Sequence, residues 1–153
     1  EPGGRGRGAR LRSSRGAVSR EAFKFHSKED YTMSMDLNFW RYKENATHNH
    51  AAVYQAACCD GETMEGLEIL PVGDILKNVA AVFSDWTVQD GGKNFEKEGH
   101  GAFQISTTPQ MVRFDCYGMQ GADLNALMDI LTGFGCPLYD PQISTRFDSW
   151  TDR

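Results

Sequence analysis

The sequence predicts an α+β fold in which an antiparallel sheet carries helices on one face. Residues 101–106 and 112–117 alternate apolar and polar side chains across the turn-like segment 107–110, which is typical of a hairpin. Apolar residues recur at helical spacing in 71–83 and again in 123–134. Because each strand and each helix has one apolar side, helices packed against one sheet face would bury both.

The first third of the chain predicts a strand and then a helix. Residues 37–42 are rich in aromatic side chains, which favours a strand. Thr47 can cap a helix over the alanine-rich residues 51–58, and Asp60-Gly61 would end that helix.

The middle of the chain predicts a second helix and a short strand. Pro71 suits the first turn of a helix because its missing N–H has no partner there. Residues 86–88 read as a strand, and Phe95 begins a candidate partner for 101–106. The apolar stripe of this helix comprises Val72, Ile75, Leu76, Val79, Val82 and Phe83.

After the hairpin, the sequence predicts a third helix and a last strand. Asp123 is a candidate N-cap, and Gly133 and Pro137 mark the end of the helix. Residues 138–139 then fit a short strand. The apolar face of this helix comprises Leu124, Leu127, Met128 and Leu131.

The expected element order is therefore β-α-α-β-β-β-α-β. This order, over about residues 36–142, is similar to a ferredoxin-like sandwich with an extra helix after the first strand. The likeness is one of fold only and implies no function, because such folds carry many.

Charge divides the chain into two parts. Eight basic and four acidic side chains give residues 1–30 a net charge of +4, which leaves −9 for residues 31–153 out of the total of −5. We therefore expect a basic, Gly/Arg/Ser-rich extended tail at 1–32 and a single α+β domain at 33–153. The sequence contains no run of about 18 apolar residues, so it predicts no membrane span.

The tail has three interpretations. The first is that it is the remainder of an organelle-targeting region, docked on a larger assembly. The second is that it does not belong to the native protein, which would then start at Met33 or Met35. The third is that it is an Arg-Gly arm that binds nucleic acid. The first is preferred, with a chloroplast or mitochondrial location. The candidate partner-binding residues of the tail are Arg5, Arg7, Arg10, Arg12, Arg15 and Arg20.

The sheet face opposite the helices is a second candidate for partner binding. Alternation places Gln104, Arg113, Asp115 and Tyr117 on that face. A face that stacks nucleic-acid bases would need several aromatic side chains and basic surroundings, and only Tyr117 is aromatic here. The pattern therefore favours a protein partner, and nucleic acid would be bound only through the tail.

The cysteines indicate a reducing, intracellular compartment. Cys58, Cys59, Cys116 and Cys136 have no spacing typical of a disulfide framework or a zinc knuckle. We expect buried or half-buried thiols.

The sequence contains no catalytic or cofactor motif, and we expect neither a cofactor nor enzyme activity. His48 and His50 precede a helix, where residues two apart do not share a face, and a metal site would need a distant third ligand such as His100. Cys136 lacks a neighbouring base, and Asp140 before Pro141 is typical of a turn.

Three functions remain open on sequence grounds. The preferred one is a non-catalytic accessory subunit of a larger complex, anchored by the basic tail. The second is a stand-alone acidic binding protein of immunity or inhibitor type, which would neutralise a basic partner. The third is a small enzyme that uses His100, Cys136 and Asp140, which would then have to meet in one pocket.

Overall fold

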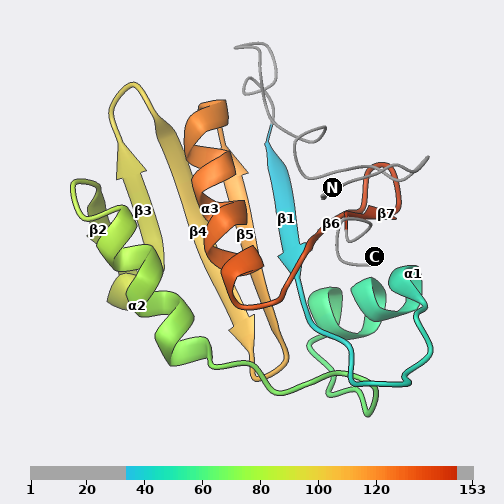
Figure 1. Cartoon of the computed structure of the whole chain (residues 1–153). Helices are drawn as coiled ribbons and strands as arrows, with labels where there is room; N and C mark the ends of the chain where they lie inside the picture. Colours follow the sequence, from blue (N-terminus) through green and yellow to red (C-terminus); the bar gives the residue numbers. More distant parts are fainter. Residues whose placement is uncertain (1–33, 148–153) are drawn as a thin grey trace, which may run out of the picture.

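The computed structural model describes residues 34–147, which form a seven-stranded antiparallel sheet with helices on it. The strands lie in the order β2-β3-β4-β5-β1-β6-β7. In Figure 1, helices α2 and α3 run side by side across the near face of this sheet. The predicted α+β class with an antiparallel sheet is confirmed.

The strands vary from two to eight residues in length, and the two long ones, β4 and β5, make the central hairpin. Their bounds are β1 Met35–Phe39, β2 Thr87–Gln89, β3 Asn94–Lys97, β4 Gly101–Thr108, β5 Met111–Tyr117, β6 Leu138–Asp140 and β7 Thr145–Arg146. The element order expected from the sequence did not include β7. It included β3 only as a candidate strand beginning at Phe95.

Two long helices and three short helical segments connect these strands. The helices are α1 His50–Val53, α2 Val72–Val82 and α3 Gly121–Gly133; a π-helix, η3, continues α1 over Tyr54–Cys59, and a 3₁₀ turn, η4, spans Asp90–Gly92. None of the helices in residues 34–147 has the length and apolarity that crossing a membrane requires.

The main core lies between the sheet and the α2–α3 layer. Ile75 and Val79 of α2 and Leu127 and Leu131 of α3 are fully buried there. Phe103 of β4 packs with its ring parallel to that of Phe95, 4.7 Å away. Burial of each such side chain stabilises the fold by about 1.5–3 kcal/mol, so the predicted apolar stripes do specify this layer.

A smaller second core lies on the opposite face, and it changes the expected architecture. Trp40 and Tyr139 are buried there against Val53 and Ala57 of α1 and the π-helix. The expectation of helices on one face therefore holds for α2 and α3 but not for the first helical segment. The reason is that Trp40, Met111 and Tyr139 give this end of the second face an apolar surface that needs a cover.

Several predicted boundaries also differ. The first strand covers Met35–Phe39 rather than 37–42, and Asn49, not Thr47, caps α1 by accepting from the Ala52 N–H at 3.1 Å. Helix α3 begins at Gly121, so Asp123 lies in its first turn and is not the cap. Val82 of the expected apolar stripe is exposed.

The hairpin turn is held by a buried glutamine. Gln110 is 4% exposed, and its amide bonds the Met64 N–H at 2.8 Å and the Met64 and Leu67 carbonyls at 2.7 and 3.0 Å. The segment between the π-helix and α2 has no strand or helix of its own. Gln110 supplies partners for its backbone and so fixes it to the β4–β5 turn.

Candidate functional site

The second face of the sheet is half covered and half open. The π-helix covers the part over β5, β1 and β6, where it contacts β5. Beyond it, Gln104, Ser106, Glu96 and Tyr117 are exposed. We call the surface formed by Glu96, Ala102, Gln104, Ser106 and Tyr117 the open face.

Strand register arranges this face in three cross-strand rows. The first row runs from Thr87 of β2 through Glu96 of β3 and Ala102 of β4 to Tyr117 of β5. The second contains Gln104, Asp115 and Asp36; the third runs from Ser106 through Arg113, Asn38 and Tyr139 to Arg146. Residues in one row are neighbours because paired strands lie about 4.8 Å apart.

Arg113 is occupied by contacts within the chain. Its Nε donates to Asp115 Oδ1 at 3.0 Å, its Nη1 donates to the Cys58 carbonyl at 3.4 Å, and its Nη2 lies 3.8 Å from Asp36 Oδ2. Burial by itself lowers the pKa of Arg113. The carboxylates of Asp115 and Asp36 raise that pKa by more, so the net change is upward. Arg113 therefore ties the π-helix to the sheet, which makes it a positioning residue rather than a contact residue.

Asp36 accepts the other bonds of this network. Its Oδ2 receives the Tyr54 hydroxyl and the Asn38 amide, each at 3.0 Å. Burial, followed by the neighbouring Cys59 and Asp36, raises the pKa of Tyr54, so its hydroxyl stays protonated and donates. Residues Asp36, Tyr54 and Asn38 were missed from the sequence. A strand begun at Met35 would have placed Asp36 and Asn38 on this face by alternation.

Two buried polar atoms near this network have no hydrogen-bond partner. Asn38 is fully buried, and its Oδ1 lacks a donor; Trp40 is fully buried as well, and its Nε1 lacks an acceptor. Both lie on the covered half of the face, and Trp40 is part of the second core. They are closed off from solvent, so they do not extend the open face.

Four of the predicted site residues lie on this one face. Gln104 and Tyr117 lie on the open face, and Asp115 is half-buried at its border beside Arg113. The six tail arginines lie outside the described residues, together with the rest of the predicted tail at 1–32. Their predicted role therefore stays a prediction.

Among the described histidines, His48, His50 and His100 form no joint site. His48 stacks on Tyr42 with ring centroids 4.0 Å apart, and His50 Nδ1 lies 2.8 Å from the Tyr42 hydroxyl. His100 instead pairs with Asp123 at 2.9 Å. Within residues 34–147, no three His, Cys, Asp or Glu side chains gather as a metal ion would require.

An aromatic cluster surrounds His48 and His50. The guanidinium of Arg146 lies over the rings of Tyr42 and Trp40, with its carbon 4.8 and 5.3 Å from their centroids. Its Nη2 also donates to the Trp40 carbonyl at 2.5 Å. This cluster holds β7 against the second core. The aromatic rings are occupied by Arg146, a cation of the chain itself.

His100 and Cys136 of the enzyme hypothesis lie at opposite ends of α3. His100 contacts the first turn of α3, whereas Cys136 follows the C-terminal end of that helix, about 15 Å away at 1.5 Å per residue. Cys136 is fully buried, and burial raises the pKa of its thiol to about 11. Asp140 accepts from the Gln142 N–H at 2.9 Å, and burial raises its pKa as well.

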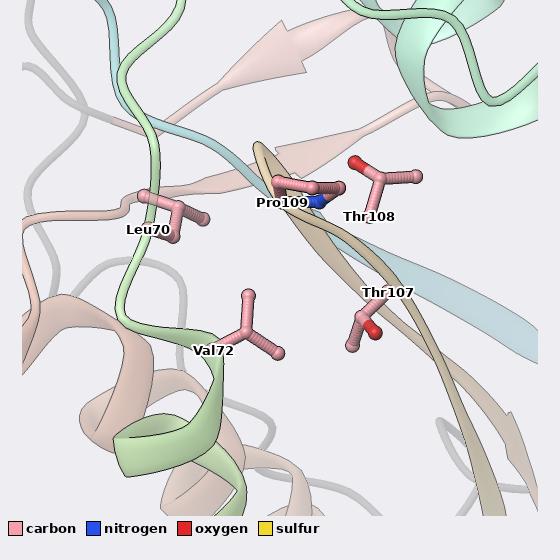
Figure 2. Close-up of a pocket in the computed structure, with 5 residues that line it drawn as sticks. All are labelled: Leu70, Val72, Thr107, Thr108 and Pro109. Carbon is pink, nitrogen blue, oxygen red and sulfur yellow. The ribbon is translucent and has the colours of Figure 1, made fainter.

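A separate hollow of about 380 Å³ lies between the tip of the β4–β5 hairpin and the segment that leads into α2. Leu70 and Val72 line one side of it, and Thr107, Thr108 and Pro109 line the other (Figure 2). It is shallow and apolar, and it contains no ionisable side chain. Such a surface can take an apolar side chain, but it supplies no group for chemistry.

Comparison with known proteins adds no relative: no protein-family model, curated protein or solved structure matches this chain.

Proposed function

We propose that this protein is a non-catalytic protein-binding domain, and that it is a small accessory subunit that docks on a larger assembly through the open face. The observation that carries the proposal is the exposure of Tyr117, 46% of whose surface faces solvent on a part of the sheet that no described helix covers. Tyrosine is enriched at binding hot spots because it offers both an apolar ring and a hydrogen-bonding hydroxyl.

The rest of the open face supports protein contact better than chemistry. Gln104 and Ser106 are exposed and offer amide and hydroxyl groups, which suit hydrogen bonds at an interface. The neighbouring cation Arg113 is already bonded to Asp115 and Cys58. A rigid sheet keeps these groups in fixed positions, which lowers the entropy cost of binding.

The basic segment 1–32 would serve as a second anchor in this proposal. Its composition supports attachment to a partner surface, and it carries the six candidate arginines. All four cysteines are free thiols, which supports a reducing compartment; an organelle remains the proposed location.

We also infer that the central strands form a ferredoxin-like core. In support, four neighbouring strands lie in the order β4-β5-β1-β6, and α3 connects β5 to β6. Strands β2, β3 and β7 would then be additions at the two edges.

An acidic binding protein of immunity or inhibitor type is the second candidate. It is favoured by the charge of residues 34–147, which carry seven Lys or Arg and fifteen Asp or Glu, a net charge of −8. Such a surface attracts basic partners and speeds their association. In this version the tail would contribute nothing to binding.

The test is site-specific cross-linking. A photoreactive benzoylphenylalanine at Gln104 should give one discrete adduct in an extract of the source cells, whereas the same residue at Ala80, exposed on α2, should give none. The protein recovered must then bind the purified chain in a defined stoichiometry. Equal labelling from both positions, or failure of the purified pair to associate, contradicts the proposal.

A variant without residues 1–32 separates the two candidates. An accessory subunit anchored by its tail should lose binding, whereas an independent acidic binder should keep its affinity within about twofold.

A further inference from the structure

We propose that the row Glu96–Ala102–Tyr117 binds the side chain of an arginine or lysine on a basic segment of the partner. This inference rests on the proposed docking role of the open face and adds the chemistry of what docks there.

The row combines a carboxylate and an aromatic ring on either side of a small residue. Glu96 and Tyr117 are both register partners of Ala102, so they lie two strand spacings, about 10 Å, apart. Only a methyl group stands between them. A long cationic side chain laid over Ala102 can therefore reach the Glu96 carboxylate at one end and cover the Tyr117 ring with its stem or head.

The charges at the row are unbalanced in the anionic direction. Among residues 34–147, no cation pairs with the exposed Glu96. Asp115 lies in the adjacent row, two residues before Tyr117 on the same strand. It shares the guanidinium of Arg113 with Asp36. Two carboxylates thus use one guanidinium, and the face keeps a net negative charge that an incoming cation would reduce.

The ring is available for such a cation. Tyr117 is half-exposed, and none of the described aromatic side chains packs against it. The chain already uses the same pairing internally, since Arg146 lies 4.8 Å from the centroid of Tyr42. Arginine or lysine over an exposed tyrosine is therefore a contact that this fold tolerates.

Other occupants fit these residues less well. Nucleic-acid phosphates would be repelled by Glu96 and Asp115. An apolar segment would have to desolvate Glu96, Gln104 and Ser106 without giving them partners. A basic protein segment satisfies both the acidic and the polar groups.

The experiment is a titration of the isotopically labelled 153-residue chain with the peptide acetyl-Gly-Arg-Gly-amide, followed by amide NMR shifts. The control peptide carries citrulline, which has nearly the shape of arginine but no charge. We expect the largest shifts at Ala102, Gln104 and Tyr117, at least about threefold smaller with citrulline and in the Glu96→Gln variant. Equal shifts with both peptides, or shifts of the same size beside Asp85 and Asp90, overturn the proposal.

Two further outcomes would assign the row to another occupant. Shifts of the same three amides that follow protein concentration without peptide would indicate a second copy of this chain. Shifts on replacing Arg5, Arg7 and Arg10 by Gln would indicate the chain's own basic segment. Either result contradicts a partner's arginine or lysine.

The partner found by cross-linking distinguishes this inference from the docking role. If it binds the wild type and Glu96→Gln equally and still cross-links at Gln104, the row assignment fails and the docking role stands. If it never cross-links at Gln104, the docking role fails whatever the peptide does.

Discussion

Gly101 is the residue at which backbone geometry most directly limits the sequence. Its φ of +94° lies in the region that favours glycine, and a Cβ there would stand 2.5 Å from the Tyr117 carbonyl oxygen. The close approach of the two strands at this point sets the position of Ala102 and Tyr117 on the open face.

We therefore predict that Gly101→Ala destabilises the protein by more than about 2 kcal/mol, because backbone strain and a steric clash add. Gly99 is the matched control, since its φ is +80° but nothing lies within 4 Å of its Cβ position. Gly99→Ala should cost about 1 kcal/mol, from strain alone. Urea denaturation measures both, and equal losses would show that the clash relaxes.

Asp140 is a residue whose ionisation should affect stability. Burial raises its pKa, the Gln142 N–H opposes this, and Asp36 raises it further. The folded state therefore holds the proton more tightly than the unfolded state. Its stabilising contribution is present below the unfolded pKa of about 3.9 and is lost as the pH rises through the folded value.

Asp140→Asn should consequently be more stable than the wild type at pH 7 and nearly equal to it at pH 3.5. The asparagine keeps an acceptor for the Gln142 N–H, so the turn is preserved. Free energies of unfolding at the two pH values provide the measurement. A difference between variant and wild type that does not change with pH would contradict the burial of this carboxyl group.

At the level of elements, the π-helix decides which half of the second face is open. Such helices are rare, and this one is joined to the sheet by Tyr54 on Asp36 and by Arg113 on the Cys58 carbonyl. These bonds cross from a helical segment to strands β1 and β5. They hold the cover in place over the second core.

Removal of one of these bonds should loosen that cover. We predict that Tyr54→Phe costs about 1–2 kcal/mol, because Asp36 loses a hydroxyl donor in a half-buried position. Tyr117→Phe is the control, since that hydroxyl is on the exposed face, and it should change stability by less than about 0.5 kcal/mol. Thermal unfolding of the two variants tests the difference. Similar losses of stability would show that the bond from Tyr54 to Asp36 does not stabilise the protein.

Elements were predictable from the sequence where one periodicity prevailed. The hairpin at 101–117, α2 and α3 follow from alternation or from apolar stripes, and they occur where expected. A helix over 51–58 was predicted and the chain is helical there, but the π form over Tyr54–Cys59 was not predictable, because its alanines and cysteines have no distinguishing pattern. The placement of α1 on the second face depends on Trp40 and Tyr139, which are far apart in sequence and meet only through β1–β6 pairing.

The candidate site was partly predictable for the same reason. Alternation along β4 and β5 correctly placed Gln104, Arg113, Asp115 and Tyr117 on one face. It could not show that Arg113 is occupied by Asp36 and Cys58, because those contacts come from β1 and the π-helix. Glu96 was missed because β3 was only a candidate strand. Ala102 lies on the predicted strand beside Gln104, but its methyl side chain carries no polar group that would have marked it as a site residue.

At the scale of the whole molecule, burial should be visible in thiol reactivity. Cys59 is exposed, whereas Cys58, Cys116 and Cys136 are buried, and burial raises the pKa of Cys58 to about 12 and of Cys136 to about 11. At pH 8 we predict that one thiol reacts rapidly with a disulfide reagent and that three react only on unfolding. Rapid reaction of two or more thiols in the native protein would contradict this packing.

The central claim is that the open face, and not the helical layer, is where this protein meets its partner. Affinity measurements with two matched variants test it most directly, since Tyr117 and Val82 are 46% and 51% exposed on opposite faces. For the partner recovered through Gln104, Tyr117→Ala should weaken binding at least about tenfold, because the ring is lost, while Val82→Ala should stay within about twofold of the wild type. Equal losses in the two variants, or a loss for Val82→Ala alone, would contradict the claim.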